Sequence, residues 1–373
     1  MRGMNLLIKP ASSACNLRCQ YCFYNDSAKN RTVECYGMMS LETLEKMIKN
    51  TLEYAEEFCT IAFQGGEPTL AGLDFYKKVV EFQNKYNVKN LKINNAIQTN
   101  GTLIDDDWAK FLKENNFLVG VSLDGPKECH DAFRMDKQNK GSFNDVMRGI
   151  SCLEKFKVDY NILCVVNSVT AKKIQSIYNF YKKNKFEYLQ FIPCIQPFGE
   201  EEERMPFSLT PKDYTKFMCT LFDLWYRDLN DRQRIHIRDF ENYVEMLLGY
   251  PPESCGKSGV CSMQYVIEAD GGCYPCDFYV LDKYKLGDVN TDSFAEIDKK
   301  RVELKFIAES RKVDDKCLKC KYINICRGGC KRYCEPFNAD GSRSLNLLCD
   351  GYYNFFEHCG ERLLQLARRV QGR

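Results

Sequence analysis

The sequence predicts an α/β fold: a partial barrel of six strand–helix units, followed by a small irregular metal-binding domain that ends in a helix. Up to about residue 195, short apolar runs alternate with longer amphipathic stretches, as in βαβ units with a parallel sheet. Between residues 250 and 350 the chain becomes rich in Cys, Gly and Asp, which is typical of a segment held together by metal. We place the boundary near residue 235, so that residues 1–235 form the barrel domain and residues 236–373 the metal-binding domain.

The individual elements follow from hydrophobic periodicity and turn signals. The predicted strands are Leu6–Lys9, Thr60–Gln64, Lys92–Gln98, Leu118–Leu123, Tyr160–Asn167 and Tyr188–Pro193. Between them the predicted helices are Ser40–Tyr54, Leu73–Tyr86, Asp105–Asn115, Ser142–Lys155 and Thr170–Asn184, and Lys212–Asp228 and Arg238–Leu248 follow the last strand. In such a barrel the functional groups lie on loops at the carboxyl ends of the strands.

Composition narrows the possible functions. The chain has 53 basic and 51 acidic residues, a balance that predicts no nucleic-acid partner and no membrane-surface partner. No apolar run approaches the length of a signal peptide core or a membrane span, so we expect a cytoplasmic protein. In a reducing cytoplasm, 21 cysteines beside only three histidines indicate thiolate-bound metal rather than disulfides or histidine-based hydrolysis.

Three cysteines directly follow the first predicted strand, at the spacing C-x3-C-x2-C: Cys15, Cys19 and Cys22. Three thiolates can hold one face of an iron–sulfur cube, and the missing fourth ligand leaves one iron open for a substrate. An open iron could bind the amino and carboxylate groups of S-adenosylmethionine (SAM) and pass an electron to its sulfonium. The alternatives are a zinc site that lacks a recognisable fourth ligand, or three unligated thiols.

With an aromatic residue, Tyr21, before the last cysteine, this triplet resembles the signature of the radical SAM superfamily. The resemblance implies that Gln64-Gly65-Gly66-Glu67-Pro68, at the end of the second strand, binds the SAM amino group through Gly65, Gly66 and Glu67. It also implies cofactor contacts for Tyr21, for Ser122 at the end of the fourth strand, and for Arg134. Taken alone, each of these segments is an ordinary polar turn.

A second group of cysteines lies in the C-terminal domain, where four of them fall within 14 residues. The group comprises Cys255, Cys261, Cys276, Cys317, Cys320, Cys326, Cys330 and Cys349. Eight thiolates suffice for two fully ligated clusters, and two zinc sites are the alternative. The array resembles the SPASM domain, and by that pattern Cys255, Cys261, Cys276 and Cys330 hold one 4Fe–4S cluster while Cys317, Cys320, Cys326 and Cys349 hold another. Cys334 or Cys359 could replace Cys349 as the last ligand.

The resemblance extends to one family of SPASM enzymes. Cys-Phe-Tyr at 22–24, the segment around the Gly-Gly-Glu-Pro turn, and Tyr274-Pro-Cys-Asp-Phe-Tyr-Val-Leu-Asp282 are similar to the anaerobic sulfatase-maturating enzymes. This similarity implies a radical SAM oxidoreductase that oxidises a cysteine, or a serine, of a sulfatase to Cα-formylglycine. The implied base is Asp277, and Tyr24 and Gln64 are the implied substrate-binding residues.

The implied cofactors are SAM and three 4Fe–4S clusters. The implied partners are a sulfatase polypeptide with a Cys-x-Pro/Ala-x-Arg motif and an electron donor such as a ferredoxin or flavodoxin. Two alternatives stay open on the residues alone. One is another peptide modification, such as thioether cross-linking, although the early first strand leaves no room for an N-terminal recognition domain. The other is a non-catalytic metal-binding electron carrier, which an incompletely ligated cluster does not favour.

Overall fold

Three separate stretches of the chain make up the first of two compact units. The computed structural model describes residues 3–199, 205–231, 234–338 and 341–372. The first unit comprises Met1–Leu123, Phe133–Asn161 and Met263–Lys305, and the second comprises Asp124–Ala132, Ile162–Ser262 and Phe306–Arg373. Both units contain residues from each side of position 235, where we predicted the domain boundary. The two compact units therefore do not correspond to the two predicted domains, and the boundary at residue 235 stays a prediction.

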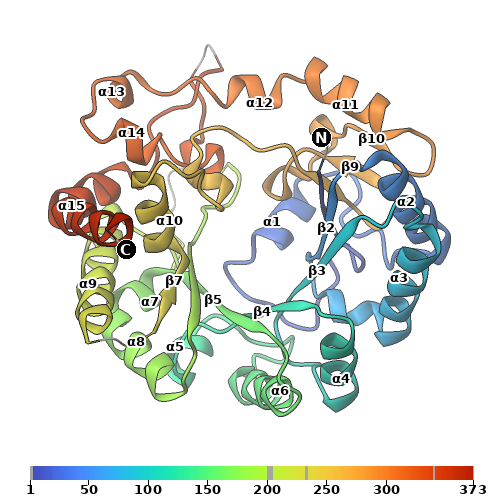
Figure 1. Ribbon diagram of the computed structural model, residues 1–373, viewed down its shortest axis with the longest axis horizontal. Coiled ribbons are helices and arrows are strands. Elements are labelled where there is room, and N and C mark those ends of the chain that lie inside the picture. Colours follow the sequence, from blue (N-terminus) through green and yellow to red (C-terminus); the bar gives the residue numbers. More distant parts are fainter. Residues whose placement is uncertain (1–2, 200–204, 232–233, 339–340, 373) are drawn as a thin grey trace. The chain divides into compact units, whose positions relative to one another are not determined.

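A parallel sheet forms the centre of the first unit (Figure 1). Its predicted strands are β1 (Met4–Ile8), β2 (Phe58–Phe63), β3 (Lys92–Thr99) and β4 (Leu118–Ser122). Each pairs in parallel with the next, with Leu6 opposite Ile61 and Ile61 opposite Asn95. Alternate side chains of β2, including Ile61 and Phe63, are fully buried, as expected for a strand covered by helices. All four predictions are confirmed to within two residues at each end.

Helices of the first unit lie along the outer side of β2, β3 and β4 in Figure 1. They are α2 (Leu41–Tyr54), α3 (Leu73–Tyr86), α4 (Asp106–Glu114) and α6 (Phe143–Lys155). The first unit also contains α1 (Phe23–Lys29), on the other side of β2 in Figure 1, α11 (Phe294–Glu303), and 3-10 turns η1 (Pro68–Ala71), η3 (Asp277–Tyr279) and η4 (Asp282–Tyr284). Ser40 and Asp105 lie one residue before α2 and α4, where their side-chain oxygens accept the amides of Thr43 and Trp108. Ser40 and Asp105, which were predicted to begin these helices, are therefore the N-cap residues that precede them.

A hairpin from the C-terminal half of the chain extends this sheet, which the sequence did not predict. Strand β8 (Tyr265–Ile267) pairs in parallel with β1, β9 (Gly272–Tyr274) pairs antiparallel with β8, and β10 (Gly287–Asp288) pairs antiparallel with β9. The strand order in this unit is β10-β9-β8-β1-β2-β3-β4. Because β8 runs parallel to β1, the turn between β8 and β9 comes to the same edge as the loop that follows β1, and Glu268 in that turn pairs with Lys9.

The second unit contains the remaining predicted elements. Its strands are β5 (Tyr160–Val166), which enters this unit at Ile162, β6 (Tyr188–Pro193) and β7 (His236–Ile237). Its helices are α5 (Lys127–His130), α7 (Ser168–Lys172), α8 (Ile174–Lys183), α9 (Pro211–Asn230), α10 (Arg238–Leu247), α12 (Phe306–Glu309), α13 (Asp315–Leu318), α14 (Ile323–Cys326) and α15 (Cys349–Gln371), with 3-10 turns η2 (Cys255–Lys257) and η5 (Lys331–Cys334). The prediction of one helix over 170–184 is wrong, because the chain breaks at Lys173 into α7 and α8.

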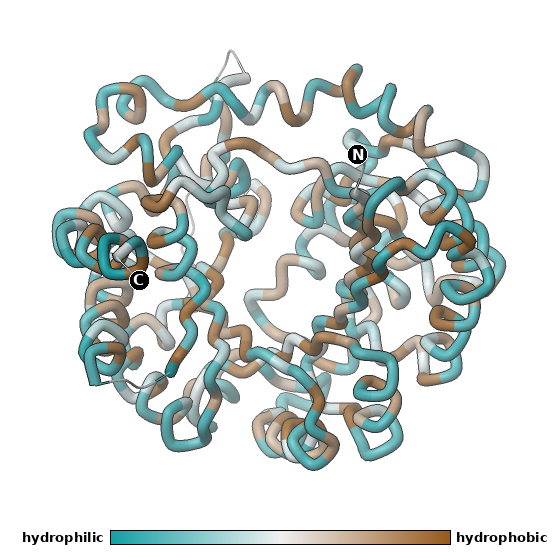
Figure 2. The backbone as a smooth tube through the Cα atoms, in the orientation of Figure 1, coloured by the Kyte–Doolittle hydropathy of each residue, from teal (hydrophilic) through white to brown (hydrophobic). Residues whose placement is uncertain are grey.

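Aromatic side chains fill the core of each unit. In the first unit the ring of Tyr76 packs edge-on against Phe63 and Trp108, with ring centroids 5.0 and 5.1 Å apart. In the second, Phe222 of α9 packs against Phe355 of the predicted C-terminal helix, α15, and these two helices lie side by side. Figure 2 shows the corresponding alternation of hydrophobic and hydrophilic residues along the helices. Among the described helices, none combines the length and the apolar character needed to cross a membrane.

Candidate active site

The cysteine triplet lies in the loop between β1 and α1, in the first unit. Cys22 is the residue that precedes α1, and all three thiols are partly buried. Burial, together with the nearby charges of Glu67, Cys19 and Cys22, raises the pKa of the Cys15 thiol to about 12. Grouped thiols in this environment form thiolates only beside a strong positive charge, such as bound iron. Three cysteine thiols in one partly buried loop are the kind of donor set that holds an iron–sulfur cluster.

Hydrogen bonds reach one sulfur of the triplet. The backbone amide of Leu17 donates to Cys15 Sγ at 3.3 Å, and the side-chain amide of Asn100 lies 3.9 Å from the same sulfur. Asn100 also donates to Asn16 Oδ1 at 2.8 Å. The segment that follows β3 thus contacts the triplet.

The Gly-Gly-Glu-Pro turn packs tightly against the loop that carries the triplet. Gly66 has a φ of +54°, and a Cβ there would lie 2.2 Å from the carbonyl oxygen of Ala14, so only glycine fits. Both carboxylate oxygens of Glu67 are used within the protein. They accept hydrogen bonds from the backbone amides of Thr69 and Asn100 and from the hydroxyls of Thr69 and Thr99. Glu67 therefore holds the turn to the end of β3, and the contacts of Gly65, Gly66 and Glu67 with SAM stay predictions.

Three further residues of the first unit were predicted to contact SAM. Ser122 ends β4, and its hydroxyl accepts the side-chain amide of Gln98 at 3.3 Å. The guanidinium carbon of Arg134 lies 5.4 Å from the ring centroid of Tyr21, a cation–π contact. Arg134 and Tyr21 therefore lie together, and the cofactor contacts of all three residues stay predictions.

Tyr24, Gln64 and Asp277, far apart in sequence, form one hydrogen-bonded group. Tyr24 Oη donates to Asp277 Oδ2 at 2.7 Å, and Gln64 Nε2 donates to the same oxygen at 3.0 Å. The side-chain amide of Gln64 also contacts Tyr24 Oη. The other carboxylate oxygen, Oδ1, is buried and has no hydrogen-bond partner among the described residues. Hydrogen bonds thus hold Oδ2 of Asp277 in place, while Oδ1 is available to accept a hydrogen bond or a proton.

Burial dominates the electrostatics of this group. Burial raises the pKa of Asp277 above its ordinary value, whereas Lys9 and the hydrogen bonds from Tyr24 and Gln64 act to lower it. Burial, and then the charge of Asp277, hold the pKa of Tyr24 well above 10. The phenol therefore stays neutral and donates, while Asp277 is the group able to exchange a proton.

A buried charge cluster lies next to this group, and sequence reasoning missed it. Lys9 Nζ lies 3.5 Å from Glu268 Oε2, and the Arg31 guanidinium donates to the same oxygen at 2.5 Å. Lys9 Nζ also lies 4.9 Å from the ring centroid of Tyr24. These side chains are almost fully buried. The sequence carried one sign of this cluster, because Lys9 directly follows the apolar run of β1. A lysine in a buried position indicates a partner of opposite charge, since an unpaired lysine is rarely buried.

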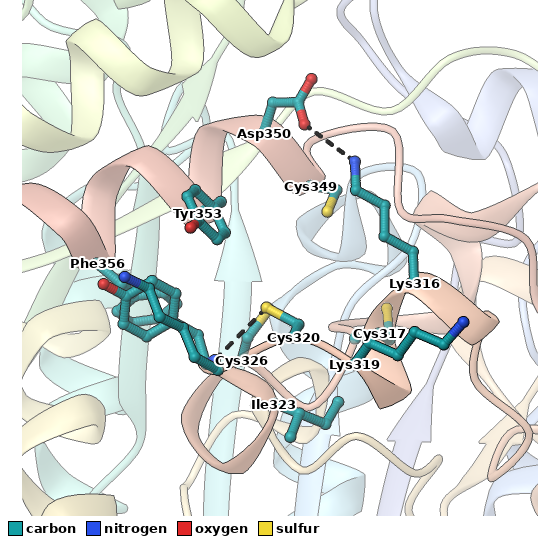
Figure 3. A pocket seen from close by; sticks show the side chains of 13 residues that line it. Lys316, Cys317, Lys319, Cys320, Ile323, Cys326, Cys349, Asp350, Tyr353 and Phe356 are labelled. Atoms are coloured by element: carbon teal, nitrogen blue, oxygen red, sulfur yellow. Dashed lines mark hydrogen bonds and ion pairs between the residues drawn. The ribbon is translucent and has the colours of Figure 1, made fainter.

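In the second unit, four of the predicted cluster cysteines line one cavity of about 580 Å³ (Figure 3). They are Cys317, Cys320, Cys326 and Cys349, from the segment around α13 and α14 and from the start of α15. Cys334 and Cys359 are not among the lining residues. Both are buried, and the Cys334 thiol donates to backbone carbonyls of its own loop. This placement supports Cys349 as the fourth ligand.

The other predicted set includes three cysteines of the second unit. Burial, together with the nearby Cys255 and Cys261, raises the pKa of Cys330 to about 12, so these thiols lie within electrostatic range of one another. The guanidinium of Arg343 holds the surrounding loops together, because it donates to the carbonyls of Gly329 and Gly259. Cys276, the fourth predicted ligand, belongs to the first unit.

Comparisons with known proteins place the chain in a family. Residues 10–181 match the radical SAM superfamily, and residues 255–321 match the iron–sulfur cluster-binding domain called SPASM. The chain is 49% identical to the cysteine-type anaerobic sulfatase-maturating enzyme of Clostridium novyi, with 99% of each chain covered. It is 48% identical to that of Clostridium perfringens over the full length of both chains. The chain belongs to the anaerobic sulfatase-maturating enzymes.

The chain is also similar to a more distant relative and to two solved structures. The serine-type anaerobic sulfatase-maturating enzyme of Bacteroides thetaiotaomicron is 35% identical, with 96% of this chain and 89% of the relative covered. A solved structure of anSMEcpe with bound AdoMet and a peptide called Cp18Cys is 48% identical, with a TM-score of 0.94 over 99% of this chain and 100% of that one. SuiB of Streptococcus suis, with 16% identity and a TM-score of 0.64, shares the fold alone.

These findings confirm the predicted fold class and the predicted enzyme class. As an anaerobic sulfatase-maturating enzyme, the protein has the radical SAM fold with a SPASM domain, and it is a radical SAM enzyme with iron–sulfur clusters. The resemblance inferred from the cysteine spacings and from the segments at 22–24 and 274–282 is therefore confirmed.

Proposed function

We propose that this enzyme oxidises a specific cysteine of a sulfatase polypeptide to Cα-formylglycine, with Asp277 as the base. The observation that carries the proposal is the arrangement of Asp277. Tyr24 and Gln64 hold one carboxylate oxygen while the other has no partner among the described residues, and the neighbouring residue is the predicted cluster ligand Cys276. A base and an electron acceptor would thus lie one residue apart.

The cofactor assignment follows the donor sets. Cys15, Cys19 and Cys22 would hold a 4Fe–4S cluster with one open iron. Cys255, Cys261, Cys276 and Cys330 would hold a second cluster, and the four cysteines that line the cavity of the second unit would hold a third. When bound, SAM supplies the 5′-deoxyadenosyl radical that removes a hydrogen atom from the substrate Cβ, and the clusters supply and accept single electrons. The backbone of Gly65 and Gly66 would bind the SAM amino group, and Tyr21, Ser122 and Arg134 would contact the rest of the molecule.

The protein's own side chains supply the proton chemistry. Conversion of the cysteine CH2–SH group to CH=S requires loss of one hydrogen atom, one proton and one electron. Asp277 Oδ1 accepts the thiol proton, while Tyr24 and Gln64 keep Oδ2 in place. Water then adds to the thioaldehyde and hydrogen sulfide leaves, which yields the aldehyde.

The substrate assignment favours cysteine over serine. Relatives of the cysteine type are 48–49% identical to this chain, whereas those of the serine type are 32–35% identical. A thiol also ionises more readily than a hydroxyl, which suits a carboxylate base. The partner would be a sulfatase segment with a Cys-x-Pro/Ala-x-Arg motif, and electrons would come from a ferredoxin or flavodoxin in the cytoplasm.

A peptide assay under strict anaerobiosis tests the proposal. The reconstituted enzyme is incubated with SAM, a reductant and a peptide that contains Cys-x-Pro-x-Arg, and a matched peptide with alanine at the cysteine is the control. Conversion of thiol to aldehyde lowers the mass by about 18 units. Formation of deoxyadenosine with a loss of about 2 mass units would instead indicate thioether cross-linking. Absence of deoxyadenosine in enzyme with full iron content would contradict radical chemistry.

A further inference from the structure

The loop over the cysteine-lined cavity of the second unit is unusually exposed for a segment that carries cluster ligands. From Asp315 to Lys321 every residue is exposed except the two cysteines, Cys317 and Cys320, which are partly buried. Leu318, between these cysteines, is 65% exposed, and Tyr353 of α15, across the cavity, is 40% exposed. A cluster held by these cysteines would therefore lie close to solvent beneath this exposed loop.

Three lysines surround this exposed apolar centre, and each is a sequence neighbour of a ligand cysteine. Lys316 and Lys319 line the cavity (Figure 3), and so does Lys321. Lys316 lies 3.6 Å from Asp350, and Lys321 pairs with Glu357. Among the described residues, none forms an ion pair with Lys319. We call Lys316, Leu318, Lys319, Lys321 and Tyr353 the lysine face.

The ion pairs on this face are weak enough to be exchanged. The side chains of Lys316 and Lys321 are 63% and 58% exposed, and pairs in such positions contribute little to stability. Carboxylates of an incoming protein can therefore replace Asp350 and Glu357 at small cost. An apolar centre with a charged rim is also the usual anatomy of a protein interface, and electron-transfer complexes use the smallest ones.

We propose that the lysine face is the docking surface for a small acidic electron-carrier protein. The inference rests on the proposed function, because it assumes that the cavity holds a cluster and that product formation releases one electron. That electron would pass from a cluster held by Cys317, Cys320, Cys326 and Cys349 to the oxidised carrier, and no bond would form or break. Positive lysines attract an acidic carrier and orient it with its cofactor toward Cys317 and Cys320.

Electron exchange with two carriers of opposite charge tests the proposal. Fully reconstituted enzyme is reduced, freed of reductant, and mixed in a stopped-flow instrument with an oxidised acidic flavodoxin or with a basic cytochrome c. In the variant K316E/K319E/K321E, we expect the second-order rate constant for flavodoxin to fall at least tenfold at low ionic strength, and that for cytochrome c to rise. The control variant K46E/K77E/K110E reverses three exposed lysines on α2, α3 and α4, each beside an acidic residue, and should change neither rate.

Two measurements keep the test decisive if the triple variant loses its cluster. The first is the single variant K319E, which alters the lysine without a described ion pair and should lower the flavodoxin rate in part. The second uses the wild type alone, because its rate with flavodoxin must fall as salt screens the attraction. A salt-independent rate, or equal losses with both carriers in variants of full iron content, would overturn the proposal. A dimer that K319E dissociates in sedimentation analysis would assign the face to a second copy and also overturn it.

The docking proposal and the proposed function can be refuted independently of each other. It measures electron exchange between the enzyme and a carrier and needs no peptide. The peptide assay uses a chemical reductant and needs no carrier protein.

Discussion

Asparagine in place of Asp277 keeps the size of the side chain but removes its charge and its capacity to accept a proton. The asparagine oxygen can still accept the bonds that Tyr24 and Gln64 donate at 2.7 and 3.0 Å. Burial raises the pKa of Asp277, which means that the buried charge is itself unfavourable. We therefore expect D277N to fold normally, with a change in unfolding free energy within about 1 kcal/mol.

The chemical loss should be large and selective. A positioned general base contributes about 10²- to 10⁴-fold to a rate, so aldehyde formation should fall by that factor. Formation of deoxyadenosine should stay measurable, because SAM is bound and cleaved by other residues. The assay measures both products in one reaction, by mass spectrometry of the peptide and chromatography of the nucleoside. D107N, at an exposed aspartate of α4, is the matched control.

The pH profile gives an independent check of the same reasoning. The base must be deprotonated, so wild-type aldehyde yield should rise with pH through the pKa of Asp277. Burial raises that pKa above the 3.8 of an ordinary aspartate, and the acid limb should lie correspondingly high. D277N should lack this limb. Wild-type aldehyde yield in D277N, or parallel loss of both products, would refute the assignment of Asp277 as the base.

Three further changes test other parts of the site. C19A should abolish deoxyadenosine formation and lower the iron content, because two thiolates do not retain the N-terminal cluster; retained SAM cleavage would contradict the ligand assignment. E268Q leaves Lys9 and Arg31 buried without their counter-charge and should lower the unfolding free energy by about 3–5 kcal/mol in urea at pH 7. Those cations lower the pKa of Glu268 below 4.5, so its contribution is complete above pH 4.5 and declines as pH falls through the lowered value. The difference between E268Q and wild type should therefore shrink in acid, and a constant difference would argue against the ion pairs. G66A should lose SAM binding by equilibrium dialysis, since its Cβ would meet a carbonyl oxygen at 2.2 Å and its φ is +54°; normal binding would show that the turn can shift.

Local patterns in the sequence determined most of the fold and the nature of the cofactors. Periodicity located the strands from β1 to β6 and the long helices, because a covered strand and an amphipathic helix each have a regular apolar repeat. Cysteine spacing indicated clusters, since ligands to one cluster often lie within a few residues of one another. Both signals are local, and both are readable without the fold.

Tertiary structure decided what depends on contacts between distant segments. The hairpin β8–β9 is too short for a periodic signal, yet its pairing with β1 brings Asp277 to Tyr24 and Gln64, 253 and 213 residues away. The buried partners of Lys9 and the gathering of Cys349 with the earlier cysteines arise in the same way. A charge can be buried, and a carboxylate can be held as a base, only after the chain has brought its partners together, and no local pattern encodes that step.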